Sequence, residues 1–392
     1  MIGDDQSSVL DRYLGRLNGP QTIGRGVPFW TCFLAVVAVL ALCPEFLSRY
    51  EIINFSNFLI SGFLALSLCL LWGYCGVLSL GQAAFFGVGG YTYGIVALNL
   101  LNAHGNTDVA FVAGIVVPTL FAGILGLIMF YARLAGVYIA ILMLVVSLMF
   151  ELFLLQTADP SYTIGAAYIG GFNGLRPASP DDPLLPSLIF GAGESVLEFD
   201  GRSVEFYYLT LGLLGAVYLG LRWLVNSSYG FLLVGVREDS HRTETFGYDV
   251  RLVQLSVFCI AAAIAGLAGV LYTAWGTFIH PNQFGLKANI LPVIWVAVGG
   301  RKDLTAALIG ALVLEWVGIR LTAVGEISLL IMGAILVVAM LVTPEGVVTT
   351  LARVVERGRT FVRARWGGIG VRRSQSVGST DDARGRGERH DS

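Results

Sequence analysis

Charged residues are scarce in this chain. Asp, Glu, Lys and Arg make up 13% of its 392 residues, whereas 55% are hydrophobic. An average soluble domain carries about 25% charged residues, and a soluble core of this length would not bury so much apolar surface. No Asp, Glu, Lys or Arg occurs between Ile52 and Thr107. The composition therefore excludes an ordinary soluble domain and predicts that the lipid bilayer is the solvent for most of the chain.

The sequence also lacks the motifs of common enzymes and cofactor sites. It contains no G-x-x-x-x-G-K-[ST] phosphate loop, so the chain is not expected to bind ATP by that mechanism. H-E-x-x-H and G-x-S-x-G are absent, and the 4 histidines and 5 cysteines match neither zinc nor disulfide spacings. We therefore expect no catalytic residue, metal site or cofactor in this chain. The net charge of −2 gives no indication of a nucleic-acid partner.

The N-terminal segment does not have the pattern of a secretory signal peptide. Residues 1–28 are polar and contain Asp4, Asp5 and Asp11, and the apolar run that follows has no small-residue cleavage site after it. We expect residues 1–28 to stay as a cytoplasmic segment and the apolar run to form the first membrane span.

The apolar runs predict about ten membrane-spanning helices, because a helix needs roughly 20 apolar residues to cross the hydrocarbon core. The predicted fold class is an all-α integral membrane protein that includes short or broken helices, with a transmembrane domain over 29–344. Its predicted spans are 29–47, two crossings within 52–107 separated by a Gly-rich break at 73–81, 109–131, 135–156, 204–224, 252–275, the short run 288–300, 304–322 and 327–343.

The loops between these spans differ in charge. Acids and prolines fill 157–203, whereas 226–251 contains Arg237, Arg242 and Arg251. Because Lys and Arg concentrate in cytoplasmic loops, we expect 157–203 to be extracytoplasmic and 226–251 and both termini to be cytoplasmic. The basic tail 345–392 has too little apolar surface to fold alone and is predicted to be disordered. Its arginines are either solvated or in contact with anionic lipid headgroups.

A Gly-rich stretch, Gly73–Tyr91, carries the first candidates for a functional site. It holds six glycines together with Ser79 and Gln82. Small residues allow close packing of helices, but transporters also use interrupted helices at membrane depth to build solute sites. The second interpretation makes Ser79, Gln82 and Phe85 candidates for a solute path, and simple helix packing is the alternative.

Glu315 is a further candidate, since it lies inside the predicted span 304–322. A carboxylate within a span is costly unless it faces the bundle interior or water. Glu315 therefore lines a path or bonds to a neighbouring helix.

The loop 226–251 predicts one short helix, from Glu238 or Asp239 to Phe246. Acids near its start suit the helix dipole, and Gly247 is a plausible helix stop. A short amphipathic helix on the cytoplasmic face is suited to docking in a groove of another protein. The alternative is a solvated connector.

Four stretches together identify a family. They are GVLSLGQAAFFGVGGY (76–91), RLAGVYIA (133–140), GGFNGL (170–175) and residues 228–300. The chain resembles, from about Glu51 to Pro344, the permeases of bacterial ABC importers for branched-chain amino acids and for urea, of the LivM and UrtC type. This resemblance implies a multi-pass permease subunit of the cytoplasmic (inner) membrane, which is not itself an enzyme. It also implies as partners a second homologous permease, two cytoplasmic ABC ATPases that bind ATP and Mg, and an extracytoplasmic solute-binding protein.

The resemblance also implies roles for single residues. It places the coupling to the ATPases at Arg237, Glu238, Asp239 and Gly247, although Thr243, Glu244 and Thr245 replace the alanines usual in the family. Asn173, within GGFNGL, is expected near the outer mouth of the path.

The solute is predicted from two short pieces, FGYD (246–249) and IWVAVGGR (294–301), which look like the urea branch. The predicted solute is urea or a short-chain amide, and a branched-chain amino acid permease is the alternative. A stand-alone channel or secondary transporter is the rival class. Ion-coupled transport usually shows several intramembrane charges, and Glu315 is nearly alone.

Overall fold

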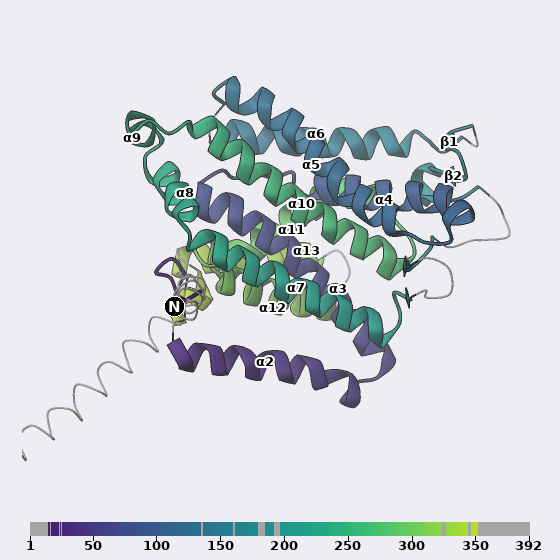
Figure 1. Cartoon of the computed structure of the whole chain (residues 1–392), viewed down its shortest axis with the longest axis horizontal. Coiled ribbons are helices and arrows are strands. Elements are labelled where there is room, and N and C mark those ends of the chain that lie inside the picture. Colours follow the sequence, from purple (N-terminus) through teal and green to yellow (C-terminus); the bar gives the residue numbers. More distant parts are fainter. Residues whose placement is uncertain are drawn as a thin grey trace, which may run out of the picture.

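The computed structural model describes residues 15, 17–22, 24, 26–134, 136–159, 161–178, 185–191, 197–322, 327–343 and 346–351. The described helices form a single bundle of roughly parallel and antiparallel rods (Figure 1). They are α2 Gly26–Phe46, α3 Arg49–Leu68, which continues as the π-helical turn η1 Cys69–Tyr74, α4 Gln82–His104, α5 Asp108–Tyr131, α6 Val137–Leu155, α7 Val204–Val225, α8 Ser228–Glu238, α9 Ser240–Thr245, α10 Val250–Gly276, α11 Leu286–Gly299, α12 Leu304–Thr322 and α13 Ile327–Val342.

Eight of the described helices are long and apolar enough to cross a membrane. They are α2, α3 with η1, α4, α5, α6, α7, α10 and α12, and the shorter apolar helices are α11 and the part of α13 from Leu330 to Ala339. The predicted all-α membrane fold with short or broken helices is therefore confirmed. The boundaries 1–28, 29–344 and 345–392 stay predictions, and residues 1–14 and 352–392 lie outside the described residues.

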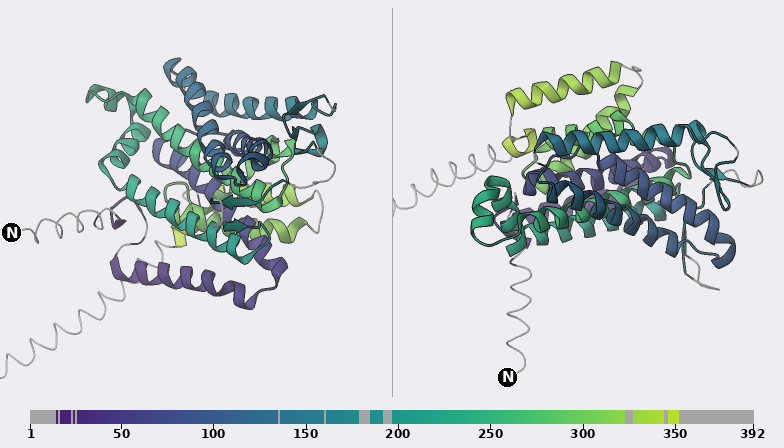
Figure 2. Two further views of the ribbon diagram at one scale, coloured as in Figure 1. Left: turned by 45° about the vertical axis from the view of Figure 1, so that its right-hand side comes forward. Right: turned by 90° about the horizontal axis from the view of Figure 1, so that it is seen from above.

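Close helix contacts at the centre of the bundle depend on glycine. Helices α3, α4, α5 and α10 pack together there, and α13 lies at the edge against α11 and α12 (Figure 2). A Cβ atom on Gly89 of α4 would lie 2.6 Å from the Gly266 carbonyl oxygen of α10. Only glycine permits this approach, so part of the Gly-rich stretch serves helix packing.

The predicted break in the Gly-rich stretch is also present. The chain leaves helical geometry after η1 and re-enters it at Gln82, where α4 begins. Gly76 has a φ of +80°, a left-handed conformation that favours glycine. π-helical turns such as η1 occur frequently at functional sites. The 76–91 stretch thus contains both a break and a packing surface.

The N-terminal segment is fixed to the bundle by Arg222 of α7, together with hydrogen bonds that the Gln21 backbone makes with Asn226 and Tyr74. Arg222 is fully buried, its Nε donates to the Leu17 carbonyl at 2.6 Å, and its Nη2 donates to the Gly24 carbonyl at 2.6 Å. Its guanidinium lies 4.3 Å from the centre of the Phe29 ring. These contacts hold Leu17 and Gly24 against the end of the bundle, while α2 itself lies on the outside next to α7 (Figure 1).

The two charged loops lie at opposite ends of the bundle, with α8 and α9 at one end and β1 and β2 at the other (Figure 1). This placement agrees with loops on opposite sides of a membrane. The segment predicted as a plain extracytoplasmic loop contains short pieces of structure that were not predicted: β1 Thr163–Ile164, β2 Ala167–Tyr168, η2 Gly171–Asn173, β3 Arg176–Pro177, β4 Leu188–Phe190 and β5 Leu197–Phe199. Between α10 and α11 lies one further turn, η3 Pro281–Phe284.

The charged loop 226–251 contains two helices instead of the one that was predicted. The second, α9, matches the predicted helix, and the Asp239 carboxylate accepts a hydrogen bond from the Arg242 backbone N–H at 3.0 Å as its N-cap. Glu238, however, ends α8. Gly247 follows α9 with a φ of +89°, as expected for a glycine that stops a helix.

Candidate functional site

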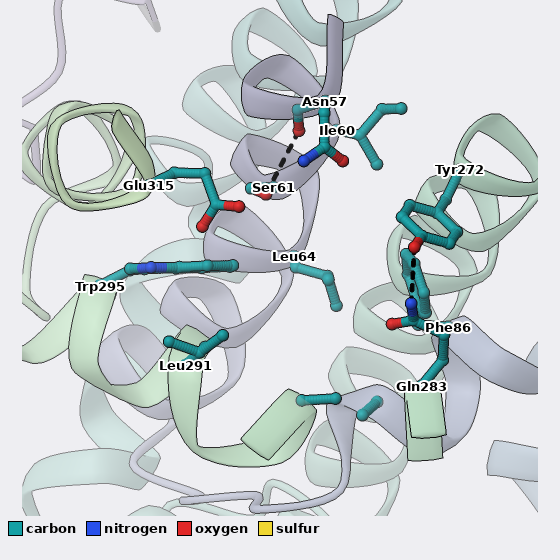
Figure 3. Close-up of a pocket in the computed structure, with 12 residues that line it drawn as sticks. Asn57, Ile60, Ser61, Leu64, Phe86, Tyr272, Gln283, Leu291, Trp295 and Glu315 are labelled. Carbon is teal, nitrogen blue, oxygen red and sulfur yellow. Dashed lines mark hydrogen bonds between the residues drawn. The ribbon is translucent and has the colours of Figure 1, made fainter. Parts of the chain in front are cut away.

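A central cavity of about 190 Å³ lies where α3, α4, α10, η3, α11 and α12 meet (Figure 3). It combines one carboxyl group, several uncharged polar groups and an aliphatic surface. The residues that line it are Asn57, Ile60, Ser61, Leu64, Ala83, Phe86, Tyr272, Gln283, Ala288, Leu291, Trp295 and Glu315.

Glu315 supplies the carboxyl group of the central cavity. It is half-buried in the middle of α12, and its carboxyl group points between Ser61 and Trp295 (Figure 3). Within the described part of the chain Glu315 makes no salt bridge. Lys287, at the start of α11, is the cation whose charge acts on it. A carboxyl group without an ion-pair partner in such surroundings is available to a cationic ligand.

The uncharged polar groups come from three different elements. The Gln283 Nε2 donates to the Tyr272 hydroxyl at 2.7 Å, and the Ser61 hydroxyl donates to the Asn57 backbone carbonyl at 3.3 Å. The Asn57 side-chain amide makes no hydrogen bond to any residue that the structure describes. The amide of Asn57 and the carbonyl oxygen of Gln283 therefore remain available at the cavity.

Of the sequence-predicted path residues, Glu315 lines the central cavity and the others do not. Ser79 is buried in the break, where its hydroxyl accepts a hydrogen bond from the Gly81 backbone N–H at 3.3 Å. Gln82 is buried at the start of α4 and accepts a hydrogen bond from the Ser67 hydroxyl at 3.1 Å. The Gln82 Nε2 is buried and has no hydrogen-bond partner among the residues that the structure describes. Gln82 thus joins α4 to α3, whereas Ser79 bonds within the break itself, and the role of both in a path stays a prediction.

Phe85 and Asn173 do not line the central cavity either. Phe85 is fully buried in an aromatic cluster, with edge-to-face contacts to Phe121 at 6.2 Å and Phe258 at 5.2 Å between ring centres. Asn173 is exposed on η2, at the end of the bundle that carries the strands. Phe85 thus packs the core here, and neither assignment to a path has been tested.

Sequence reasoning missed Asn57, Ser61 and Gln283. Asn57 and Ser61 are four residues apart on α3 and therefore lie on one helix face. That spacing of polar residues within a charge-free span was an available signal. Gln283 lies in a short turn, and only the tertiary fold brings it beside Tyr272.

The predicted coupling residues Arg237 and Glu238 line a second pocket, of about 290 Å³, at the end of the bundle that carries α8 and α9. We call it the basic pocket, and its residues are Trp72, Gly73, Gly76, Arg237, Glu238, Arg301 and Lys302. The Arg237 Nη1 donates to the Gly73 carbonyl, and its Nη2 pairs with the Glu238 carboxylate at 2.7 Å. The hydrogen bond from Arg237 to Glu238 and the charge of Arg237 lower the pKa of Glu238. Arg237 therefore ties α8 to the end of η1.

The departure from the family pattern in α9 has a visible structural role at one position. The Thr243 hydroxyl donates to the Asp239 backbone carbonyl at 2.9 Å, and Thr243 is buried against α8. Glu244 and Thr245 are exposed. The replacement of alanines is therefore compatible with a well-formed α9.

Comparison with known proteins identifies relatives of this chain. Residues 52–340 match the family described as "Branched-chain amino acid transport system / permease component". The "High-affinity branched-chain amino acid transport system permease protein LivM" of Escherichia coli (strain K12) is 27% identical over 330 residues, which cover 80% of this chain and 74% of the relative. The protein of the same name from Salmonella typhimurium is 27% identical over 328 residues, with the same coverage.

A more distant organism supplies a third relative. The "Probable branched-chain amino acid transport permease protein LivM" of Methanocaldococcus jannaschii is 26% identical over 279 residues, which cover 63% of this chain and 74% of the relative. No solved structure matches the chain. Because the family match covers well over half of the sequence, the chain belongs to the family of branched-chain amino acid transport system permease components.

Proposed function

We propose that this chain is the pore-forming permease subunit of an ABC importer that carries branched-chain amino acids across the cytoplasmic membrane. Family membership supports the permease role, and the names of the relatives support the solute. The comparisons favour the amino-acid alternative over the urea that was predicted from the FGYD and IWVAVGGR pieces.

The chemistry of the central cavity supports the same solute. A branched-chain amino acid has an ammonium group, a carboxylate and an aliphatic side chain. Glu315 is positioned to pair with the ammonium group, and the aliphatic surface of Ile60, Leu64 and Leu291 fits the side chain. Urea can donate hydrogen bonds to a carboxylate, but it has no positive charge to pair with Glu315 and no apolar group to fill the aliphatic surface. The unpaired Glu315 carboxyl group beside an aliphatic surface is the observation that carries this proposal.

The energy for transport comes, in this proposal, from partner subunits. The chain has no phosphate loop, so two ABC ATPases bind ATP and Mg and dock on the α8–α9 end, which is cytoplasmic together with both termini. A second homologous permease completes the path, and a solute-binding protein delivers solute at the opposite end, near the strands. Arg237 connects α8 to η1 through Gly73, so a displacement of α8 acts on α3. Rigid-body movement of packed helices then alternates access to the cavity.

Transport by the reconstituted importer tests the proposal. Liposomes that contain both permeases and the ATPases are supplied with binding protein and ATP, and uptake of labelled leucine and labelled urea is compared. We expect ATP-dependent uptake of leucine and none of urea. Liposomes that contain this chain alone form the second arm. ATP-independent leucine movement there would support the channel or secondary-transporter rival, and urea uptake by the complete importer would overturn the solute assignment.

A further inference from the structure

The basic pocket brings together three segments that are far apart in the sequence. Trp72, Gly73 and Gly76 end the α3–η1 helix, Arg237 and Glu238 end α8, and Arg301 and Lys302 form the turn between α11 and α12. The Cys69 thiol donates to the Arg301 backbone carbonyl at 3.4 Å, which fixes this turn against η1. The pocket is therefore built into the end of the bundle and is not a chance grouping of surface side chains.

The charges in this pocket do not balance. It contains three cations and one carboxylate, and Arg237 engages that carboxylate, Glu238, at 2.7 Å. Arg301 and Lys302 make no salt bridge with any residue that the structure describes. The Arg301 guanidinium lies 5.5 Å from the centre of the Trp72 ring, so stacking holds it in place while its N–H groups stay available. An oriented arginine beside a lysine is a suitable receptor for a carboxylate.

The position of the pocket indicates where such a carboxylate comes from. Helix α3 lies inside the bundle, in contact with α7, α10, α11 and α12, so the pocket at its end faces away from the lipid-exposed sides. The same end carries α9 and two exposed aromatic residues, Phe246 at 82% and Tyr248 at 54% exposure. Exposed aromatic side chains are typical of surfaces that bind another protein. A protein that covers this end of the bundle reaches the basic pocket.

We propose that the basic pocket receives an acidic side chain of the cytoplasmic ATPase, whose carboxylate binds between Arg301 and Lys302. The identity of this partner rests on the proposed function. The inserted carboxylate balances the excess positive charge of the α11–α12 turn. The contact is distinct from docking of α9 itself, since neither Arg301 nor Lys302 belongs to the α8–α9 segment.

The test measures the affinity of the purified ATPase for the permease pair in nanodiscs. The variant carries Arg301→Gln and Lys302→Gln together. Loss of a charged hydrogen-bonding contact weakens binding by roughly 10-fold or more, and we expect the difference from the wild type to shrink at high salt, where exposed charges are screened. Arg301→Lys with Lys302→Arg keeps both charges and is expected to retain most of the affinity.

Arg133→Gln serves as the matched control. Arg133 is an exposed arginine in the link between α5 and α6, outside the basic pocket, and its loss is expected to leave the affinity unchanged. Equal thermal unfolding of all variants shows that they fold. Wild-type affinity in the double Gln variant, or an equal loss in the Arg133 control, overturns the proposal. If the wild-type permease pair does not bind the ATPase at all, the proposed function fails first, and this inference fails with it.

Discussion

Glu315→Gln is the substitution that tests the central cavity most directly. Glutamine keeps the length and nearly the volume of the side chain but removes its negative charge. Glu315 makes no salt bridge within the described residues, so the change breaks no ion pair of the protein itself. Its effect on transport therefore reports the contact between the carboxylate and the solute, and not a loss of packing.

The size of the effect follows from the contact that is lost. A hydrogen bond to a charged group contributes about 1.5–3 kcal/mol, and each 1.4 kcal/mol corresponds to about tenfold. We expect the kcat/KM for leucine uptake to fall by roughly 10- to 150-fold. Glu315→Asp keeps the charge but shortens the side chain by one methylene, so it is expected to lose less than the glutamine variant.

The assay is initial-rate uptake of labelled leucine, at concentrations below the KM, into liposomes that contain the whole importer. Glu151→Gln is the matched control, because Glu151 lies on α6 and does not line the cavity. We expect the control to transport at the wild-type rate, and equal ATPase activity of all variants shows that they assemble. Wild-type uptake by Glu315→Gln would refute the assignment of an ammonium-binding role to this residue.

Two further substitutions test the fold. Arg222→Met removes the hydrogen bonds to the Leu17 and Gly24 carbonyls, so backbone amides around these two residues are expected to exchange with solvent at least about 10-fold faster in hydrogen-exchange mass spectrometry. Unchanged protection would show that the remaining contacts with Asn226 and Tyr74 suffice. Gly269→Ala forces a Cβ atom into the Phe86 carbonyl oxygen, which costs about 1–3 kcal/mol and should lower the Tm in detergent. Gly212→Ala, where the Cβ atom meets open space, is the control, and an equal Tm for both would contradict the packing argument.

The positions of the spans could be predicted from the sequence because hydrophobicity and charge act locally along the chain. The first span was predicted at 29–47 and lies at Gly26–Phe46, and the break expected at 73–81 separates η1 from α4. The strands of two or three residues in 157–203 could not be predicted, since so few residues show no periodicity. Helix α8 was missed because it is short and its polar and charged ends, Ser228 and Glu238, are typical of a loop between apolar spans.

The site was only partly predictable from the sequence. A polar residue within a predicted span gives the same sequence pattern whether its side chain packs against another helix or lines a path. Glu315 stood out by its charge, and the structure places it at the central cavity. Ser79 and Gln82 stood out equally, yet in this conformation their side chains make hydrogen bonds inside the protein. Spacing along one helix shows only which polar side chains share a face. Whether that face lines a cavity depends on helix rotation and on the neighbouring helices.

The central cavity and the basic pocket are connected because the same helices line both. Ser61 of α3 lines the cavity, and Trp72, roughly 16 Å farther along at a rise of 1.5 Å per residue, lines the pocket. Likewise, Trp295 and Glu315 at the cavity flank the turn that carries Arg301 to the pocket. Packed helices move as rigid bodies. A partner that displaces the helix ends at the basic pocket therefore also moves the surface of the central cavity, unless η1 or the glycine at the end of α11 bends and absorbs the displacement. Under the proposed function, binding of the ATPase at one end thus reaches the solute at the other through helices that include α3 and the α11–α12 pair.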